Sequence, residues 1–181
     1  MHHNKGWGIH IYTTGTWGAN NNTVINNRAY FNGRSDTRGW GIILSSGKNN
    51  SAINNIVFGN LGGIEVDYGA VSSSVYNNVV YNNSAYGLYV GAEANYSTVK
   101  NNVEYANPFW AFSMVGPSTV NATNLVDNDP VFIDPQNWDF RLQDGSPAID
   151  AGTFLPEVPR DFAGVARPQR AGSDIGAFEK V

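Results

Sequence analysis

Two carboxylates, Glu65 and Asp67, stand two residues apart in the short run Gly63-Ile-Glu-Val-Asp67. In an extended strand such residues point to the same face, with Cα atoms about 6.5–7 Å apart. The pair could be the acid and base of a glycoside hydrolase, whose carboxyl groups lie roughly 5–9.5 Å apart. It could instead hold Ca²⁺, which takes oxygen ligands, against an acidic sugar. Two solvated acids on an outer face are the structural alternative.

Histidine and aromatic residues occur in similar glycine-led runs. His10 and Tyr89 occupy the position of Glu65 in their own runs, and Tyr12 occupies that of Asp67. With Tyr12 or Tyr89, His10 could supply the base and acid of a β-elimination, although a histidine near a terminus is often incidental.

Trp7 and Trp40 each precede the first glycine of such a run, so both are expected at the same corner of successive repeats. A flat, apolar indole with one hydrogen-bond donor stacks well on a sugar face. Packing of a loop onto the repeat explains the two tryptophans equally well.

The runs that carry these residues recur five times and alternate apolar with mixed positions. Alternation in a strand separates an inner from an outer face. The inward residues are expected to be Ile9, Ile11, Ile42, Leu44, Ile64, Val66, Leu88, Val90, Phe112 and Met114. The outward columns are then His10, Ile43, Glu65, Tyr89 and Ser113, followed by Tyr12, Ser45, Asp67, Gly91 and Val115. Five coils about 4.8 Å apart would give an outer surface long enough for a few sugar units.

Paired asparagines mark the period of the repeat. They are Asn26–Asn27, Asn54–Asn55, Asn77–Asn78 and Asn101–Asn102, with Asn121 as a weaker fifth member. Five positions after each pair stand Asn32, Asn60, Asn83, Asn107 and, in the fifth repeat, Asp127. Intervals of this length are typical of a solenoid. Asparagine tolerates tight-turn dihedrals, and its stacked amides can form hydrogen-bonded ladders.

Other columns follow the same frame. A hydroxyl column precedes the pairs, followed by small residues expected to face inward, and an aromatic column (Tyr30, Phe58, Tyr81, Tyr105, Leu125) is expected in the interior. Three short strands per coil predict an all-β fold, a right-handed parallel β-helix of about five coils over residues 1–128. A β-sandwich would instead show hairpin turns and no fixed columns.

After Asn128 the composition changes to loops punctuated by proline and aspartate. The motifs are Asp129-Pro-Val-Phe132, Asp139-Phe-Arg-Leu142, Ser146-Pro-Ala-Ile-Asp-Ala-Gly152, Asp161-Phe-Ala-Gly164, Arg167-Pro168 and Asp174-Ile-Gly-Ala-Phe-Glu179. In this order they resemble the C-terminal segment of secreted bacterial right-handed β-helix repeat proteins of the pectate-lyase-like superfamily. The resemblance implies a β-helix and an extracellular, carbohydrate-directed setting, and it does not imply one activity.

The segment 129–181 is expected to belong to the same domain and to cap the last coil, whose backbone and apolar interior would otherwise be exposed. Asp150, Asp161, Asp174 and Arg167 are expected to hold its loops through charge-assisted hydrogen bonds.

Composition narrows the class of partner. A net charge of −4 and scattered basic residues argue against nucleic acid. No apolar run approaches the ~20 residues that cross a bilayer. Without cysteine no disulfide framework exists, which leaves the compartment open. No signal peptide precedes Gly6, so either a leader has been trimmed, which is favoured, or the chain is the tail of a longer protein. An uncovered N-terminal coil is expected to associate end to end or to carry a folded-over loop.

These observations predict an extracellular β-helix acting on polysaccharides, as a lyase or hydrolase of acidic glycans. Similar enzymes place their active sites on the outer face of the glycine-led strand. Pectate-lyase-like enzymes use arginine or lysine as the base, and no basic residue falls on the outward columns, which counts against a Ca²⁺/arginine lyase. The alternatives are a non-catalytic carbohydrate-binding or cell-surface module, and a structural fragment of a larger protein. Further candidates for contact with sugars are Trp17, Trp110, Arg28, Arg34, Arg38 and Lys100.

Overall fold

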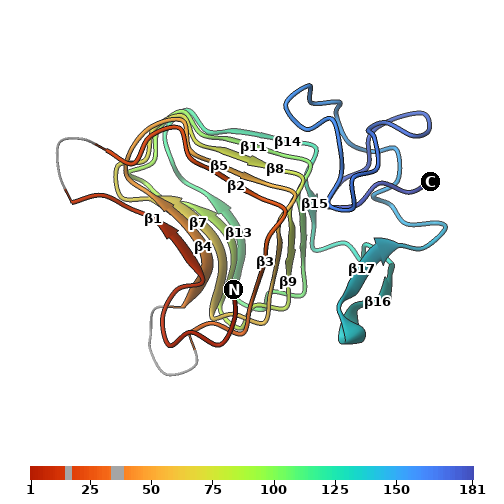
Figure 1. Cartoon of the computed structure of the whole chain (residues 1–181), viewed down its shortest axis with the longest axis horizontal. Coiled ribbons are helices and arrows are strands. Elements are labelled where there is room, and N and C mark those ends of the chain that lie inside the picture. The colour runs from red at the N-terminus through yellow and green to blue at the C-terminus, as the bar shows by residue number, and fades with distance from the viewer. Residues whose placement is uncertain (15–17, 34–38) are drawn as a thin grey trace.

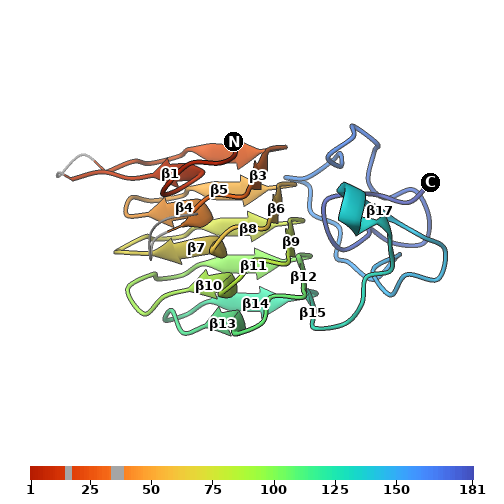
Figure 2. The same cartoon turned by 90° about the horizontal axis from the view of Figure 1, so that it is seen from below.

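The computed structural model describes residues 1–14, 18–33 and 39–181. In this part of the chain, three parallel sheets of five strands each wrap around one core. Each coil adds one strand to every sheet, and the coils stack one above another (Figure 2). The predicted all-β parallel β-helix is therefore confirmed.

The strands of the three sheets follow one another in every coil (Figure 1). The first sheet contains β1 (Ile9–Ile11), β4 (Trp40–Ser45), β7 (Gly62–Asp67), β10 (Tyr86–Val90) and β13 (Trp110–Met114). The second contains β2 (Thr23–Ile25), β5 (Ser51–Ile53), β8 (Ser74–Tyr76), β11 (Thr98–Lys100) and β14 (Val120–Ala122). The third contains β3 (Arg28–Tyr30), β6 (Ile56–Phe58), β9 (Val79–Tyr81), β12 (Val103–Tyr105) and β15 (Leu125–Val126). A hairpin of β16 (Phe132–Asp134) and β17 (Asp139–Leu142), joined by the 3₁₀ turn η1 (Pro135–Asn137), follows.

The core inside the coils is narrow and aliphatic. The inward residues predicted for the first sheet all lie there, with Ile9, Ile11, Phe112 and Met114 only partly buried in the outermost coils. The central residue of each three-residue strand completes the core, as Val75 does in β8 and Val80 in β9. Among the described residues, no helix has the length and apolar character that a membrane crossing needs.

Buried asparagine ladders connect the coils at two corners. Nδ2 of Asn55 donates to Oδ1 of Asn78 at 3.0 Å, and the backbone N–H of Asn55 donates to the same oxygen at 2.8 Å. The second hydrogen of Nδ2 is used by the carbonyl of Val24 in the preceding coil, at 2.8 Å. This pattern runs through Asn27, Asn55, Asn78, Asn102 and Asn124 at one corner, and through Asn32, Asn60, Asn83 and Asn107 at the other.

The fifth coil differs from the predicted alignment. Asn102 donates to Asn124, and Thr98 pairs with Val120, so Asn124 is the fifth rung and Asn121 is not. The prediction was wrong because the fifth coil has lost the asparagine pair: Thr123 takes the place of the first asparagine, with its φ of 53°. Its hydroxyl donates to Oδ1 of Asn101 at 2.6 Å, which preserves a link between the two coils.

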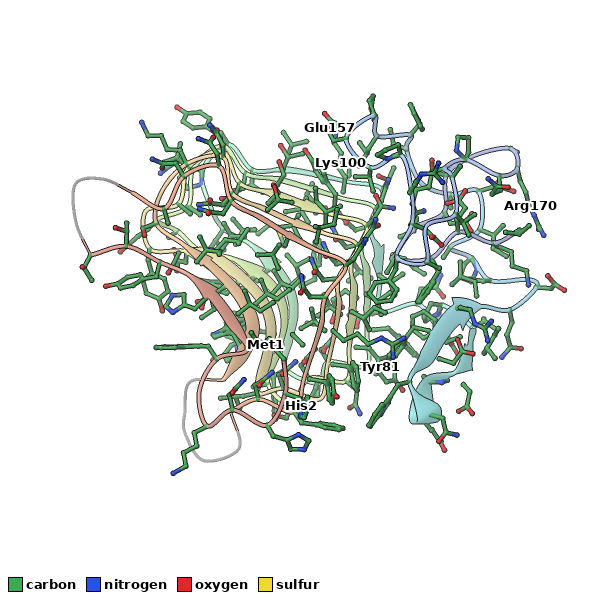
Figure 3. The ribbon with its side chains drawn as sticks, viewed as in Figure 1. Met1, His2, Tyr81, Lys100, Glu157 and Arg170 are labelled. Carbon is green, nitrogen blue, oxygen red and sulfur yellow. The ribbon has the colours of Figure 1, made fainter. Side chains whose placement is uncertain are left out.

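The aromatic column was predicted inside the coils and lies outside them. The middle residue of a three-residue strand points inward, so its two neighbours point outward. Ala29 and Val57 accordingly join the core, whereas Tyr30 and Phe58 face away from it, with their rings stacked at 5.1 Å. Tyr81 extends from β9 toward the C-terminal segment (Figure 3). The C-terminal segment covers this column, so Phe58 is buried and Tyr30 and Tyr81 are partly buried although none of them is interior.

The C-terminal segment lies along the side of the stack, not across its last coil (Figures 1 and 2). Phe132, Phe140 and Leu142 of the hairpin pack on the outer face of the third sheet together with Ala148 and Phe178. The sequence predicts the segment over the last coil; the segment lies instead on the outer face of the third sheet, where its apolar residues bury those of the sheet. In the last coil, Phe112 and Met114 stay partly exposed.

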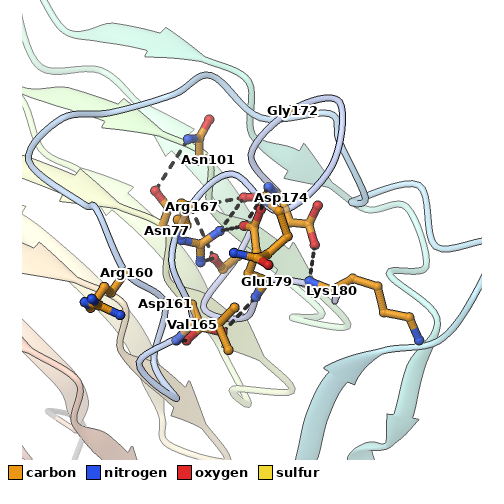
Figure 4. A network of polar contacts seen from close by, with 12 residues as sticks. Asn77, Asn101, Arg160, Asp161, Val165, Arg167, Gly172, Asp174, Glu179 and Lys180 are labelled. Carbon is orange, nitrogen blue, oxygen red and sulfur yellow. Dashed lines mark hydrogen bonds and ion pairs between the residues drawn. The ribbon is translucent and has the colours of Figure 1, made fainter.

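The first asparagine of the second, third and fourth pairs attaches this segment to the coils. Asn54, Asn77 and Asn101 adopt the left-handed conformation with φ of 50°, 53° and 56°, which directs their amides outward. Asn77 Nδ2 donates to the carbonyls of Asp174 and Gly176, at 3.1 and 3.2 Å (Figure 4). Asn54 and Asn101 donate in the same way to other carbonyls of the segment. One asparagine column thus joins the coils, and the next joins the coils to their flanking segment.

Charged side chains hold the segment together, as the sequence predicted. Arg167 forms a buried ion pair with Glu179 at 2.6 Å and donates to the carbonyls of Asp174 and Gly176, the two that Asn77 also reaches. Asp161 accepts from two backbone N–H groups of its own loop. These bonds shape the carbonyls that the asparagines of the coils recognise.

Residues at the N-terminus add to the first coil. The carbonyl of Met1 accepts from the backbone N–H of Tyr30, and that of Asn4 accepts from Gly33. Asn4 Nδ2 also donates to Asn32 Oδ1 at 2.9 Å, which extends one ladder by a rung. Part of the first coil is therefore covered by the chain itself.

Glu104 is a carboxylate inside the core. It occupies the inward position of β12, where β6 and β9 carry valine, and it is fully buried. Asn107 donates to its Oε1, while Oε2 has no hydrogen-bond partner. Burial, reinforced by the charge of Asp127, raises its pKa to about 7, and the hydrogen bond from Asn107 opposes this shift.

Replacing the outward asparagine should loosen the C-terminal segment. Asn77→Gly keeps the positive φ and removes two hydrogen bonds to buried carbonyls, so we expect a loss of about 1–3 kcal/mol in the free energy of unfolding. Urea denaturation measures it. Asn26→Gly is the matched control, because Asn26 has the same φ of 55° but lies exposed. Equal losses in the two variants would contradict the docking role of Asn77.

Removing the charge of Glu104 should stabilise the protein at neutral pH. The carboxyl group of Glu104 has a pKa of about 7 in the folded protein against an ordinary value of 4.5, so it holds its proton more tightly in the folded state. Its contribution to the free energy of unfolding therefore falls as the pH rises from 4.5 through 7. Glu104→Gln should match wild type near pH 4.5 and exceed it by about 3 kcal/mol above pH 8. Glu157→Gln, at an exposed position, is the control and should not change the pH dependence. A parallel pH dependence in Glu104→Gln and wild type would refute the assignment.

Candidate functional site

A groove of about 1530 Å³ runs along the outer face of the first sheet. This face lies on the side of the stack away from the C-terminal segment (Figure 1). The register places His10, Ile43, Glu65, Tyr89 and Ser113 side by side across the five strands, as the sequence predicted. Ser45 and Asp67 pair in the next outward column.

Glu65 lies at the floor of the groove, on β7. Its side chain is 5% exposed, and its Oε2 has no hydrogen-bond partner. Burial raises its pKa to about 7, with the negative charge of Asp67 as the second cause. A carboxyl group in this state is a proton donor over the whole acidic range.

Asp67 is held beside it by the backbone of the following coil. Its Oδ1 accepts from the N–H of Glu93 at 3.2 Å. The side chain rests over Gly91, where a Cβ would lie 2.0 Å from Cγ of Asp67. Gly91 is therefore needed for the position of this carboxylate. Unlike Glu65, Asp67 is only partly buried, so the two acids of the predicted pair have different surroundings.

His10 belongs to a separate cluster at the first coil. Its Nε2 lies 2.6 Å from Oγ of Ser45, and its ring packs between Trp7 and Tyr12, at 4.6 and 5.1 Å. Burial lowers its pKa, which favours the neutral imidazole. Ile43 stands between His10 and Glu65 in the column, so the structure does not bring these two predicted catalytic groups into contact.

Tyr89 is the neighbour of Glu65 on β10. Burial raises the pKa of its phenol, with Asp67 and Glu65 as further causes. A phenol with a raised pKa stays protonated near neutral pH, so Tyr89 is not available as a base there. Its hydroxyl remains able to donate a hydrogen bond to a ligand in the groove.

Aromatic side chains form one wall of the groove at the start of the strands. The Trp40 ring lies over Gly62, where a Cβ would come within 2.6 Å of it. It thereby stacks on Tyr86, two coils away, at 5.2 Å and 23°, and on Tyr89 at 6.3 Å and 27°. Trp110 pairs with Tyr86 in the next strand and also lines the groove. We call Trp40, Tyr86 and Trp110 the aromatic wall.

Sequence reasoning placed Trp7 and Trp40 at this corner, gave Trp110 as a further candidate for contact with sugars, and missed Tyr86. Tyr86 directly precedes the glycine that opens its run, Gly87, and this spacing was the available signal. Of the other candidates, Arg28 lies on the third sheet over the ring of Phe162, and Lys100 on the second sheet. Trp17, Arg34 and Arg38 lie outside the described residues.

The predicted calcium site consists of Glu65 and Asp67. Calcium takes six to eight oxygen ligands, and Glu65 and Asp67 provide two carboxylates. In the described part of the chain, no group of three or more histidine, cysteine, aspartate or glutamate side chains could hold a metal ion. These side chains alone do not make up a calcium shell.

A parallel solenoid with a lined outer groove defines a class of protein, the β-helix proteins. The sequence matches the family described as right handed beta helix region over residues 1–128, and the chain belongs to this family. No curated protein matches the chain. Among solved structures, the crystal structure of pectate lyase Pel9A is similar over 99% of this chain and 64% of its own, with TM-score 0.47 and 17% identity. The chain thus spans 64% of the length of that lyase.

The coupling between the two acids can be measured directly. Asp67→Asn removes the charge and should lower the pKa of Glu65 from about 7, yet leave it above 4.5 because burial is the larger cause. Carbon-13 NMR of labelled glutamate, in a Glu104→Gln background, follows one carboxyl near pH 7.

Glu93→Gln is the matched control for this titration, since it changes an exposed side chain beside Asp67 and keeps the backbone bond. An unchanged midpoint in Asp67→Asn, or an equal change in both variants, would show that the acids are not coupled.

Proposed function

We propose that the groove cleaves glycosidic bonds of a polysaccharide by hydrolysis, with Glu65 as general acid and Asp67 as the second carboxyl group. The observation that supports this most strongly is the contrast between two neighbouring acids. Glu65 is buried with an unpartnered oxygen and keeps its proton up to about pH 7. Asp67 is partly exposed and is held by a backbone N–H. Neighbouring carboxyls in different environments are the usual arrangement of acid and base in glycosidases.

The proposed reaction follows from the surroundings of the two carboxyl groups. Glu65 gives its proton to the glycosidic oxygen as the bond to the anomeric carbon breaks. Asp67 either takes a proton from the water that attacks the anomeric carbon or attacks that carbon itself and is released by water. Tyr89 donates a hydrogen bond to the substrate, and Trp7, Tyr12 and Trp40 provide apolar faces on which sugars stack.

A lyase acting on acidic glycans is the second candidate, and the neutral state of His10 favours it. A neutral imidazole can remove the proton beside a uronate carboxylate, with Tyr12 as the acid. Calcium bound by Glu65, Asp67 and the substrate would assist this reaction. The distance of His10 from the paired acids makes it the weaker candidate.

The same groove would serve a non-catalytic carbohydrate-binding or cell-surface module, or a structural fragment of a larger protein. We further propose an extracellular setting in a bacterium, because residues 129–179 resemble secreted β-helix repeat proteins. Residues 129–181 are proposed to be part of the same domain as the coils, and the N-terminal coil is proposed to associate end to end. Sedimentation velocity over a range of concentrations would reveal this association.

Hydrolysis is tested by the release of reducing ends from a panel of neutral and acidic polysaccharides. Glu65→Gln should lower the rate by about 10²–10⁴-fold, because it removes the proton donor. In wild type, the rate should fall as pH rises through about 7, where Glu65 loses its proton.

Two variants separate the candidate reactions. His10→Ala should keep most of the hydrolysis and would abolish β-elimination, which is seen as absorbance of an unsaturated product. Glu93→Gln is the control at an exposed position. Full activity in Glu65→Gln, or an unsaturated product that depends on His10, would exclude the proposed hydrolysis.

A further inference from the structure

The part of the groove that the structure describes has few positive charges that could attract an acidic ligand. Among its described lining residues, Lys48 is the one lysine or arginine, and it lies exposed in the turn after β4. The floor carries Asp67 and Glu65, and His10 is packed between aromatic rings. The ionisable side chains described on the floor are therefore acidic groups and one histidine, and none is a lysine or arginine.

A uronate polymer would bring a negative charge onto this floor at every sugar. Like charges that come close together at a protein surface repel each other. No described basic side chain lines the floor to compensate this repulsion.

Apolar contact surface, by contrast, is present along the whole groove. Tyr12 and Trp7 lie at the first coil, 55% and 39% exposed, and Trp110 lies at the fifth coil, 62% exposed. Four coil spacings of about 4.8 Å separate these ends, the length of a few sugar units. The aromatic wall joins them, since Trp40 leans over Gly62 onto Tyr86.

From the aromatic surface and the lack of basic residues among the described residues of the floor, we infer that the groove takes an uncharged glycan, which lies across the coils with sugars stacked on Tyr12 and Trp110 and with Glu65 between them. This inference rests on the proposed function in using the same groove, and it departs from the acidic glycans that the sequence predicts. Hydroxyl-rich sugars combine apolar faces, which suit tryptophan and tyrosine, with polar edges that reach Tyr89 and Asp67.

Binding to an inactive variant tests the inference separately from catalysis. Calorimetry with Glu65→Gln would compare neutral oligosaccharides (β-glucan, xylan and mannan fragments) with oligogalacturonate and oligoalginate, each with calcium and with chelator. A neutral oligosaccharide should bind at least tenfold more tightly than either uronate, with no effect of chelator. Trp110→Ala should weaken its binding about tenfold, because the stacking face is lost.

Phe109→Ala is the matched control, since Phe109 is 76% exposed beside Trp110 and does not line the groove. Three results would overturn the inference. These are tighter binding of a uronate, no binding of any neutral oligosaccharide to Glu65→Gln, and equal losses of affinity in Trp110→Ala and Phe109→Ala. Binding of a neutral glycan that wild type does not cleave would refute the proposed hydrolysis and leave the inference standing. Hydrolysis of uronans and of no neutral polysaccharide would refute the inference and leave the proposed hydrolysis standing.

Discussion

Satisfying buried amides is the constraint on which the rest of this structure depends. Each asparagine in the middle of a ladder has Nδ2 donating both to the next asparagine and to a carbonyl of the preceding coil, as Asn55 does to Asn78 and Val24. An unpaired amide in the core would cost about 1–3 kcal/mol, so a coil cannot shift by one residue without losing several such bonds. The ladders therefore hold every outward column in register, including the column that carries Glu65.

The same residue type has two roles because its backbone conformation differs. Asn78 points into the coil and continues a ladder, whereas Asn77, with φ of 53°, points out and holds the carbonyls of Asp174 and Gly176. The turn between two sheets thus stabilises the stack and the flanking segment together. One side of the solenoid is covered in this way, and the opposite side stays open as the groove.

Two glycines shape this groove because they have no Cβ atom. Gly91 makes room for Asp67, and Gly62 makes room for Trp40, because a Cβ at either position would overlap the neighbouring side chain. Glu65 is buried by the same close packing, which raises its pKa, while Asp67 remains partly exposed. The different burial of the two acids arises from their neighbours in adjacent coils.

The sequence by itself determined the period, the parallel β-helix and the outward column of Glu65, because a repeat places like residues on like and alternation assigns them to faces. It did not determine that Tyr30 and Phe58 face outward, because aromatic rings are buried on an outer face only where another segment covers them, as the C-terminal segment does here. The fifth rung, Asn124, was missed because Thr123 replaces the usual asparagine. Tertiary structure alone decided the place of the C-terminal segment, the wall of Trp40 and Tyr86, and the burial of Glu65 and Glu104. These features depend on packing between coils and loops distant in the chain, which local spacing does not encode.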